Sequence, residues 1–151
     1  MHRGVHDFFA WVEQHPDFPG LHLNPASASA ELQTVEDRIA SPLPADLRLM
    51  LSRYNGGAFP SGTLLRAGDE SVPDSMLAAL QDLAQRLRMS VRDPELPFPF
   101  FRSDDGGILA FDRSAGPVSD TWPILDYYVD SGEQHMVHRT FDGFCRFNDH
   151  A

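Results

Sequence analysis

Acidic and aromatic side chains alternate in the segment 123–130, PILDYYVD. Successive side chains of a β-strand point to opposite faces, so this segment predicts one face with Asp126, Tyr128 and Asp130. Leu125, Tyr127 and Val129 would share the other face. Two carboxylates on one face could act as a general acid–base pair. A solvated sheet face, or a surface that binds a partner, is the better interpretation.

Other acidic and aromatic residues can extend this face into a partner-binding surface. Glu133 lies in the turn after the segment, and Asp104 and Asp105 begin a predicted hairpin turn. Trp122 precedes the segment and either joins the surface or belongs to the core. An exposed tyrosine among acids suits an anchor for a basic surface. The predicted partner-binding residues are Asp104, Asp105, Trp122, Asp126, Tyr128, Asp130 and Glu133.

No pattern of residues predicts a metal site or a cofactor. His2 and His6 have a helical i, i+4 spacing near the terminus, and His135 and His138 would point to opposite faces of a strand. The segment 104–107, DDGG, is similar to the start of a calcium loop but lacks the later acidic ligands. A hairpin turn is the better interpretation, because Asp-Gly between apolar runs is a strong hairpin signal.

Nucleophilic catalysis finds no support in the sequence either. The chain has no G-x-S-x-G, P-loop, G-x-G-x-x-G or C-x-x-C motif. Cys145 is the single cysteine, so no internal disulfide can form. Its neighbours Phe144 and Phe147 predict a buried, structural thiol. We therefore expect a protein with no catalytic centre.

Length and charge narrow the class of protein further. The 151 residues fit one domain, and 22 acids oppose 12 cations, all of them arginine, for a net charge of -10. Nucleic-acid binding needs a basic face, so this charge argues against it and is compatible with a basic protein partner. No apolar run approaches the roughly 18 residues of a membrane span, and the N-terminus does not fit a signal peptide. We expect a cytoplasmic protein.

The apolar periodicity predicts helices first and hairpin-linked strands later, with one long helix between the strands. This order indicates an α+β fold, in which helices pack on one side of an antiparallel or mixed twisted sheet. Helices are predicted over 5–14, 30–40, 44–54 and 71–89, the last beginning at Ser71 with Pro73 in its first turn. Strands are predicted over 62–68, 108–111, 123–129 and 135–139, and a closing helical turn over 141–147. The segment 93–101 is too rich in proline for a helix and is expected to lead into an edge-like strand.

The sharpest local signal is the end of the helix over 44–54. Its apolar stripe runs through Leu47 and Leu51 to Tyr54 and stops at Asn55-Gly56-Gly57. Glycine and asparagine enter the left-handed region at the least steric cost. We therefore predict a helix end at which at least one of these three residues has a positive φ.

Together these segments resemble the SUKH superfamily, the bacterial relatives of a fungal cell-wall-synthesis regulator. The resemblance rests on Leu32, Val35, Glu36, Ile39, Leu43, Pro44, Leu47, Leu51, Tyr54, Asn55, Gly56 and Gly57, then on the segments 105–111, 123–125 and 140–144. It implies an α+β domain over 29–151, preceded by a helical extension over 1–28 that packs on it. The position of Leu47, which is more often aromatic in the family, and the long 70–97 insert depart from the pattern.

The resemblance also implies a function, namely protein binding. Many bacterial members resemble immunity proteins that bind and block a toxin, often a nuclease, and an acidic chain could occupy the basic cleft of such an enzyme. The expected partner is thus a cognate toxin or another basic protein. An intracellular scaffold or regulator remains an alternative, as does an enzyme of unrecognised type. A toxin gene beside this one would favour immunity.

Overall fold

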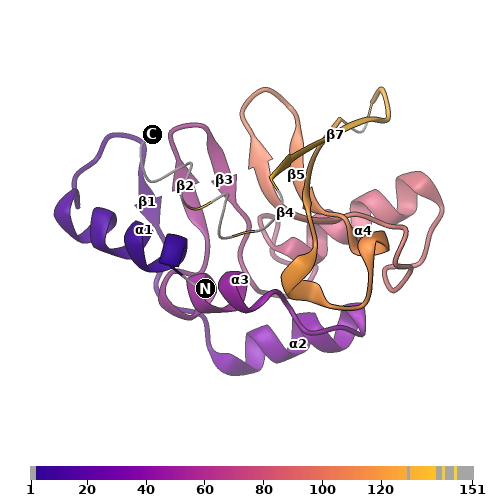
Figure 1. Cartoon of the computed structure of the whole chain (residues 1–151), viewed down its shortest axis with the longest axis horizontal. Coiled ribbons are helices and arrows are strands. Elements are labelled where there is room, and N and C mark those ends of the chain that lie inside the picture. The colour runs from indigo at the N-terminus through magenta and orange to yellow at the C-terminus, as the bar shows by residue number, and fades with distance from the viewer. Residues whose placement is uncertain (1–2, 129, 139–140, 142–144, 146–151) are drawn as a thin grey trace.

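The computed structural model describes residues 3–128, 130–138, 141 and 145. These residues form four α-helices and a seven-stranded antiparallel sheet, which confirms the predicted α+β class (Figure 1). The helices are α1 (Arg3–Gln14), α2 (Ser29–Ile39), α3 (Ala45–Arg53) and α4 (Met76–Leu87), with 3-10 turns η1 (Arg113–Ala115) and η2 (Ser119–Thr121). The strands are β1 (His22–Leu23), β2 (Gly57–Phe59), β3 (Gly62–Leu64), β4 (Phe98–Ser103), β5 (Ile108–Phe111), β6 (Ile124–Tyr128) and β7 (Glu133–His138).

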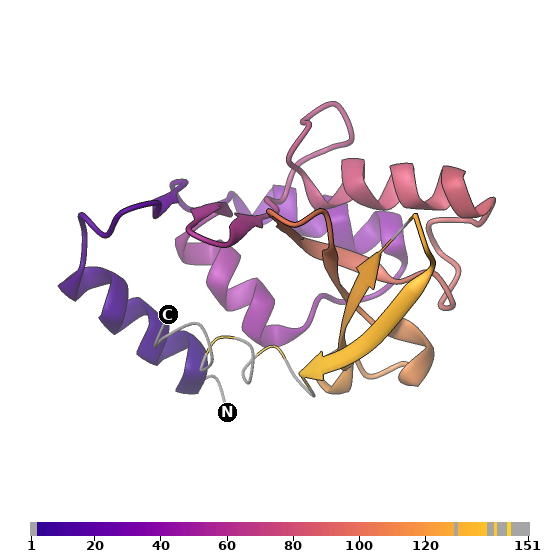
Figure 2. The same cartoon turned by 90° about the horizontal axis from the view of Figure 1, so that it is seen from above.

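The strands follow one another in space in the order in which they occur in the sequence, from β1 to β7. Helices are inserted between them: α2 and α3 separate β1 from β2, α4 separates β3 from β4, and η1 and η2 separate β5 from β6. α1 and α4 lie at opposite ends of the molecule (Figure 2). Each strand is therefore placed by the one before it, from one edge of the sheet to the other.

Aromatic side chains dominate the core between the sheet and the helices. Phe100 and Phe111 stack with their ring centroids 4.6 Å apart. Phe8 of α1 stacks on Phe59 of β2 at 5.7 Å, and both belong to or pack against the same core cluster. Stacked and edge-on aromatic pairs stabilise a core beyond the area that they bury. The N-terminal residues thus share one core with the rest of the chain.

Carboxylates fix the connection between α2 and α3. Glu36 accepts a 2.7 Å hydrogen bond from the backbone N–H of Leu43 and a 2.5 Å bond from Arg48. Asp120 of η2 accepts another, of 2.5 Å, from the N–H of Ala45 in the first turn of α3. A carboxylate at this end of a helix satisfies a free N–H and interacts favourably with the helix dipole. These two carboxylates therefore fix the backbone on both sides of the Leu43-Pro44 peptide.

The junction formed by Asn55, Gly56 and Gly57 ends α3 as predicted. The helix stops at Arg53, and Gly56 and Gly57 have φ values of +73° and +140°. The buried side chain of Asn55 accepts a 2.7 Å hydrogen bond from the N–H of Ala67 and donates one of 3.2 Å to its carbonyl. Asn24 donates from its side chain to the Asn55 carbonyl at 2.9 Å. The junction thereby joins α3 to β1, to β2 and to the chain after β3.

Three predicted elements differ from the structure in their extent or position. The strand over 62–68 ends at Leu64, because the backbone of Arg66 pairs with Asp74 and Met76 and the side chain of Asn55 takes the hydrogen bonds of Ala67. The long helix begins at Met76 and not at Ser71, since the Oγ of Ser75 caps it by accepting from Ala78 N–H. The segment predicted as an edge forms β4, which pairs with both β3 and β5 and is central.

Several other elements agree with the sequence or fall outside what is described. The helices over 5–14, 30–40 and 44–54 and the strands over 108–111, 123–129 and 135–139 correspond to α1, α2, α3, β5, β6 and β7. The short strands β1 and β2 were not predicted. The predicted helical turn over 141–147 lies mostly outside the described residues. Cys145 is 2% exposed, which confirms a buried thiol.

The junction gives a stability prediction with a matched control. Gly56 and Gly132 both have a φ of +73°, but a Cβ on Gly56 would lie 2.5 Å from the Leu64 carbonyl oxygen, while one on Gly132 would have nothing within 4 Å. Gly132→Ala should cost about 1 kcal/mol of unfolding free energy from backbone strain. Gly56→Ala should cost at least about 2 kcal/mol more, because the backbone must shift. Urea unfolding measures both, and equal losses would contradict the account.

Candidate protein-binding surface

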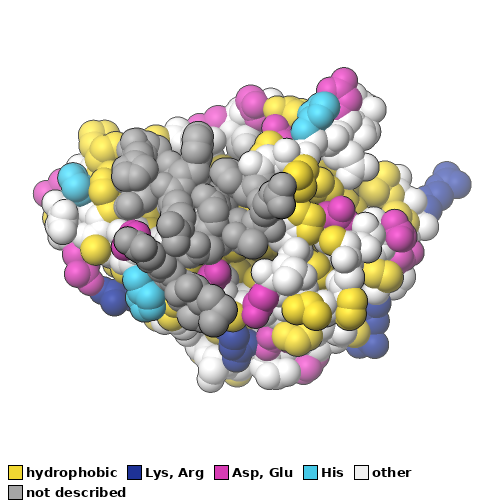
Figure 3. All heavy atoms as spheres, viewed as in Figure 1, with side chains coloured by type: hydrophobic (Ala, Val, Ile, Leu, Met, Phe, Trp, Pro, Cys, Tyr) yellow, Lys and Arg dark blue, Asp and Glu magenta, His cyan; other side chains and the backbone are white. Residues whose placement is uncertain are grey.

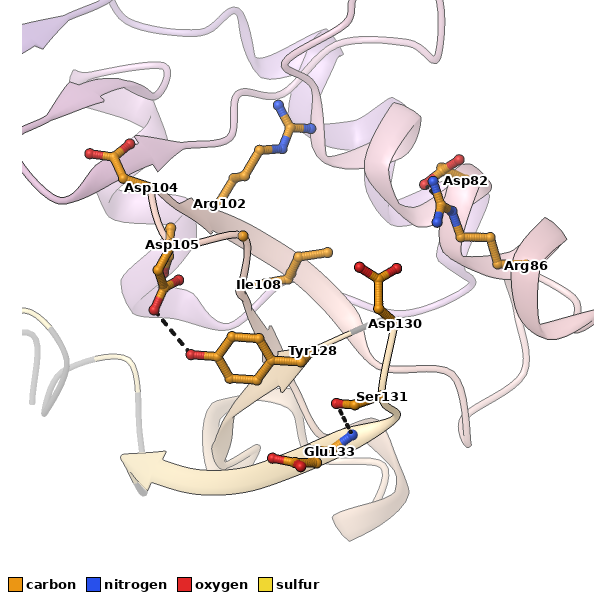
Figure 4. A pocket seen from close by; sticks show the side chains of 12 residues that line it. Asp82, Arg86, Arg102, Asp104, Asp105, Ile108, Tyr128, Asp130, Ser131 and Glu133 are labelled. Carbon is orange, nitrogen blue, oxygen red and sulfur yellow. Dashed lines mark hydrogen bonds and ion pairs between the residues drawn. The ribbon is translucent and has the colours of Figure 1, made fainter.

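An open hollow of about 630 Å³ lies between α4 and the ends of the β4–β5 and β6–β7 hairpins (Figure 4). Five carboxylates and two guanidinium groups line it, and we call it the acidic hollow. Its lining residues are Asp82, Arg86, Arg102, Ser103, Asp104, Asp105, Gly106, Ile108, Tyr128, Asp130, Ser131 and Glu133. Figure 3 shows acidic side chains along the upper edge of the molecule, where the two hairpins end in Figure 1.

The structure brings five of the seven predicted surface residues together in this hollow. Asp104 and Asp105 come from the first hairpin, Tyr128 from β6, and Asp130 and Glu133 from the second hairpin. Asp126 lies on β6 opposite His135 but does not line the hollow. The alternation along β6 is present, since Leu125 and Tyr127 are buried while Asp126 and Tyr128 are half-buried.

Trp122 lies in the core and not on this surface, which is the second of the two positions that the sequence left open for it. Its side chain is 3% exposed and belongs to the core cluster. The indole N–H donates a 2.8 Å hydrogen bond to the carbonyl of Gly116. A buried tryptophan usually finds such a partner for its N–H. The residue therefore fixes the η1–η2 loop against the core.

A tight turn holds the first pair of acids at the tip of the β4–β5 hairpin. The N–H of Ser103 donates to the carbonyl of Gly107 at 2.9 Å, which closes the turn. The carboxylate of Asp105 accepts from Gly107 N–H at 3.0 Å, and Gly106 takes a φ of +91°. These features confirm the predicted Asp-Gly hairpin. The N–H of Asp104 donates to the Ser61 carbonyl at 3.0 Å, which ties this tip to the β2–β3 turn.

Tyr128 connects the two hairpins across the hollow. Its hydroxyl donates a 3.1 Å hydrogen bond to Asp105 Oδ2 (Figure 4). A Cβ on Gly107 would lie 3.0 Å from both the Tyr128 ring and the Asp126 carboxylate, so glycine leaves the space that the ring occupies. The hydrogen bond to Asp105, together with burial and the charge of Asp126, raises the pKa of the Tyr128 phenol. The phenol is therefore a stable donor at neutral pH.

The two cations of the hollow offset only part of the charge of its five carboxylates. Arg86 pairs with Asp82 at 3.0 Å along α4, four residues apart. Arg102 forms no ion pair within the described part of the chain and is exposed. Asp104, Asp105, Asp130 and Glu133 remain without a guanidinium partner among the same residues. The hollow accordingly keeps a negative charge that is open to solvent.

Sequence reasoning missed Asp82, Arg86 and Arg102 as part of this surface. They come from α4 and β4, and only the fold brings them beside the second hairpin. The i, i+4 spacing of Asp82 and Arg86 does mark an exposed helix face. Nothing in the local sequence of Arg102 links it to residues 128–133.

Arg113 is the most buried cation of the described chain, and it lies away from the hollow. Burial lowers its pKa to about 10, although the charge of Asp93 opposes this effect. Its guanidinium donates to the carbonyls of Leu96 at 2.9 Å, Val91 at 3.0 Å and Asp93 at 2.9 Å. Buried charge needs such hydrogen bonds. Arg113 thus holds the loop between α4 and β4 and is a structural residue.

Two further findings concern metals and membranes. Over residues 3–128, 130–138, 141 and 145, no group of three or more His, Cys, Asp or Glu side chains is placed to hold a metal ion. No helix in that part of the chain combines the length and the apolar character that crossing a membrane requires.

The phenol of Tyr128 gives a pH prediction. Replacing Asp105 by asparagine removes the negative charge beside the hydroxyl, so the pKa of Tyr128 should fall toward its ordinary value of about 10. The raised pKa means that this contact stabilises the folded state below pH about 10 and is lost as the pH rises through the raised value. Tyrosinate absorbance measures the titration, with Tyr128→Phe to identify the relevant step. An unchanged curve in Asp105→Asn would refute the hydrogen bond.

Comparison with known proteins identifies the family of this chain. The model of the family SUKH_6, described as SMI1-KNR4 cell-wall, matches residues 29–145. A comparison with curated proteins finds no match. The match spans more than half of the chain and includes α2, α3, the Asn55–Gly57 junction and all strands from β2 to β7. The chain belongs to the SUKH superfamily, within its SMI1-KNR4 cell-wall family.

Proposed function

We propose that this protein is a non-catalytic, cytoplasmic binding protein that neutralises a cognate bacterial toxin through the acidic hollow. The observation that carries the proposal is the convergence of five carboxylates and Tyr128 from α4 and two hairpins on one open surface. The net charge of -10 adds a long-range attraction for a basic partner. Both features suit a toxin with a basic active cleft, such as a nuclease.

The chemistry of the hollow matches the side chains that such a cleft presents. A carboxylate accepts two parallel hydrogen bonds from an arginine, which gives both attraction and orientation. Asp104, Asp105, Asp130 and Glu133 are exposed, so association does not first have to break a described ion pair. Tyr128 presents a half-buried ring beside them, and aromatic anchors of this kind contribute much of the binding energy at protein interfaces.

Charge reversal tests this proposal with a control of equal charge. Asp104 and Asp130 line the hollow, and no hydrogen bond or ion pair of their carboxylates is described. Asp104→Arg with Asp130→Arg should therefore leave the fold intact. In co-expression with a cognate toxin, this variant should no longer rescue growth, and its association with the toxin should slow by about tenfold or more at low salt, because steering is lost.

The matched control reverses Asp7 and Asp17, which are exposed on α1 and on the loop after it. This pair changes the net charge by the same amount but lies outside the acidic hollow. It should keep protection close to that of the unmodified protein. Full protection by a folded Asp104→Arg, Asp130→Arg protein would refute the hollow as the binding surface. If both double variants lost protection, net charge alone and not the position of the acids would explain the result.

A scaffold or regulatory role is the second candidate, and the description of the matched family as cell-wall favours it. The acidic hollow would then bind a basic partner that is not a toxin. Growth experiments separate the two roles. A partner that binds the hollow tightly and does not harm the cell when expressed alone would favour the regulator.

A further inference from the structure

β7 forms one edge of the sheet, and its outer side has no partner strand within the described residues. The strand runs over six residues, Glu133–His138, and contains no proline. Its register against β6 is regular from Glu133 to Met136 and shifts between Met136 and His138. An edge strand leaves N–H and C=O groups along one side unpaired. The segment of four regular residues can therefore pair with another chain through the N–H and C=O groups that point outward, which belong to every second residue.

The opposite edge of the sheet is built differently. β1 has only two residues, His22–Leu23, and Pro19 and Pro25 stand close to either end. Short edges and nearby prolines are the usual means by which proteins prevent unwanted strand pairing. β7 is longer than β1 and has no proline close to either end. β1 is thus protected against pairing with a strand of another chain, whereas β7 is only weakly protected.

β7 also exposes apolar side chains. The large hydrophobic residues that are exposed in the described chain are Leu87, Val118, Met136 and Val137, and two of these four lie on this one strand. Met136 is 60% exposed and Val137 44%. A long edge strand with exposed apolar groups is otherwise a site of aggregation. The edge of β7 is therefore a surface that another strand could cover.

The charges beside β7 favour a basic occupant over a second copy of the chain. Glu133, the first residue of β7, lines the acidic hollow together with Asp105 and Asp130. A strand laid along β7 would have its basic side chains next to these carboxylates at one end and apolar ones next to Met136 at the other. A second copy carries the same charge of -10, so pairing two β7 edges would bring like charges together.

We propose that β7 binds its partner by strand addition: an extended, basic segment of the partner protein pairs with Glu133–Met136 and continues the sheet. This inference rests on the proposed function, because it specifies how the partner of the acidic hollow is held. Main-chain hydrogen bonds supply affinity in this mode of recognition, and side chains supply selectivity. The hollow contributes the preference for basic side chains.

A synthetic probe tests strand addition on the unmodified full chain. The probe is a peptide of alternating arginine and valine, long enough to span β7. Two controls accompany it: the same sequence with every backbone amide N-methylated, which keeps the charge but cannot pair, and a version with glutamate in place of arginine. Calorimetry gives the affinities, and amide hydrogen exchange compares Glu133–Met136 with His22 and Leu23 of β1.

Strand addition predicts that the arginine peptide binds at least about tenfold more tightly than either control, since each control removes one kind of contact. It also predicts slower exchange at Glu133–Met136 and no change in β1. Equal binding of the N-methylated peptide, or protection confined to β1, would overturn the inference while leaving the acidic hollow as a charge-based surface. Failure of every peptide together with dimerisation of the free protein would assign the edge to a second copy. Loss of toxin neutralisation in the charge-reversal experiment decides the proposed function separately.

Discussion

The pairing of the Asn55 side chain with the backbone of Ala67 is the contact on which the arrangement of the sheet depends. It lies where α3 ends and where the chains of β1, β2 and β3 meet. No side chain fits at the next two positions, since a Cβ would lie 2.5 Å from the Leu64 carbonyl at Gly56 and 2.4 Å from the His22 carbonyl at Gly57. The strands pair in sequence order, so this junction also places β4 to β7. The acidic hollow is built at the far end of that series.

In the described chain, some charged residues bind backbone groups or each other, while the carboxylates of the acidic hollow stay exposed to solvent. Glu36 and Asp120 bind backbone N–H groups at the start of α3, and Arg113 binds three carbonyls in the loop before β4. Other arginines pair with acids outside the hollow, as in Arg38–Glu70 and Arg53–Glu13. Structural contacts thus engage many cations elsewhere, which leaves the carboxylates of the hollow with an excess of negative charge. The negative surface follows from this distribution as much as from the net charge.

Local signals in the sequence predicted the helices and the hairpins, and nonlocal contacts account for the differences. Apolar periodicity located α1, α2 and α3, and the left-handed preference of glycine located the junction. β1 and β2 are too short for an alternating pattern to show. The cap of α4 at Ser75 and not Ser71 depends on the chain beside it, where Arg66 N–H donates to the Asp74 carbonyl and Met76 N–H to that of Arg66. The hollow was predicted in part, because β6 alternates and both turns are acidic, whereas α4 enters it only through the fold.

We propose that a basic protein partner covers the acidic hollow. Chemical labelling of carboxylates, with mass spectrometry of the free protein and of its complex with a basic protein partner, tests this proposal residue by residue. The account predicts that Asp104, Asp105, Asp130 and Glu133 lose reactivity in the complex while Asp7 and Asp17 keep it. Protection of Asp7 and Asp17 with unchanged labelling in the hollow would contradict the account.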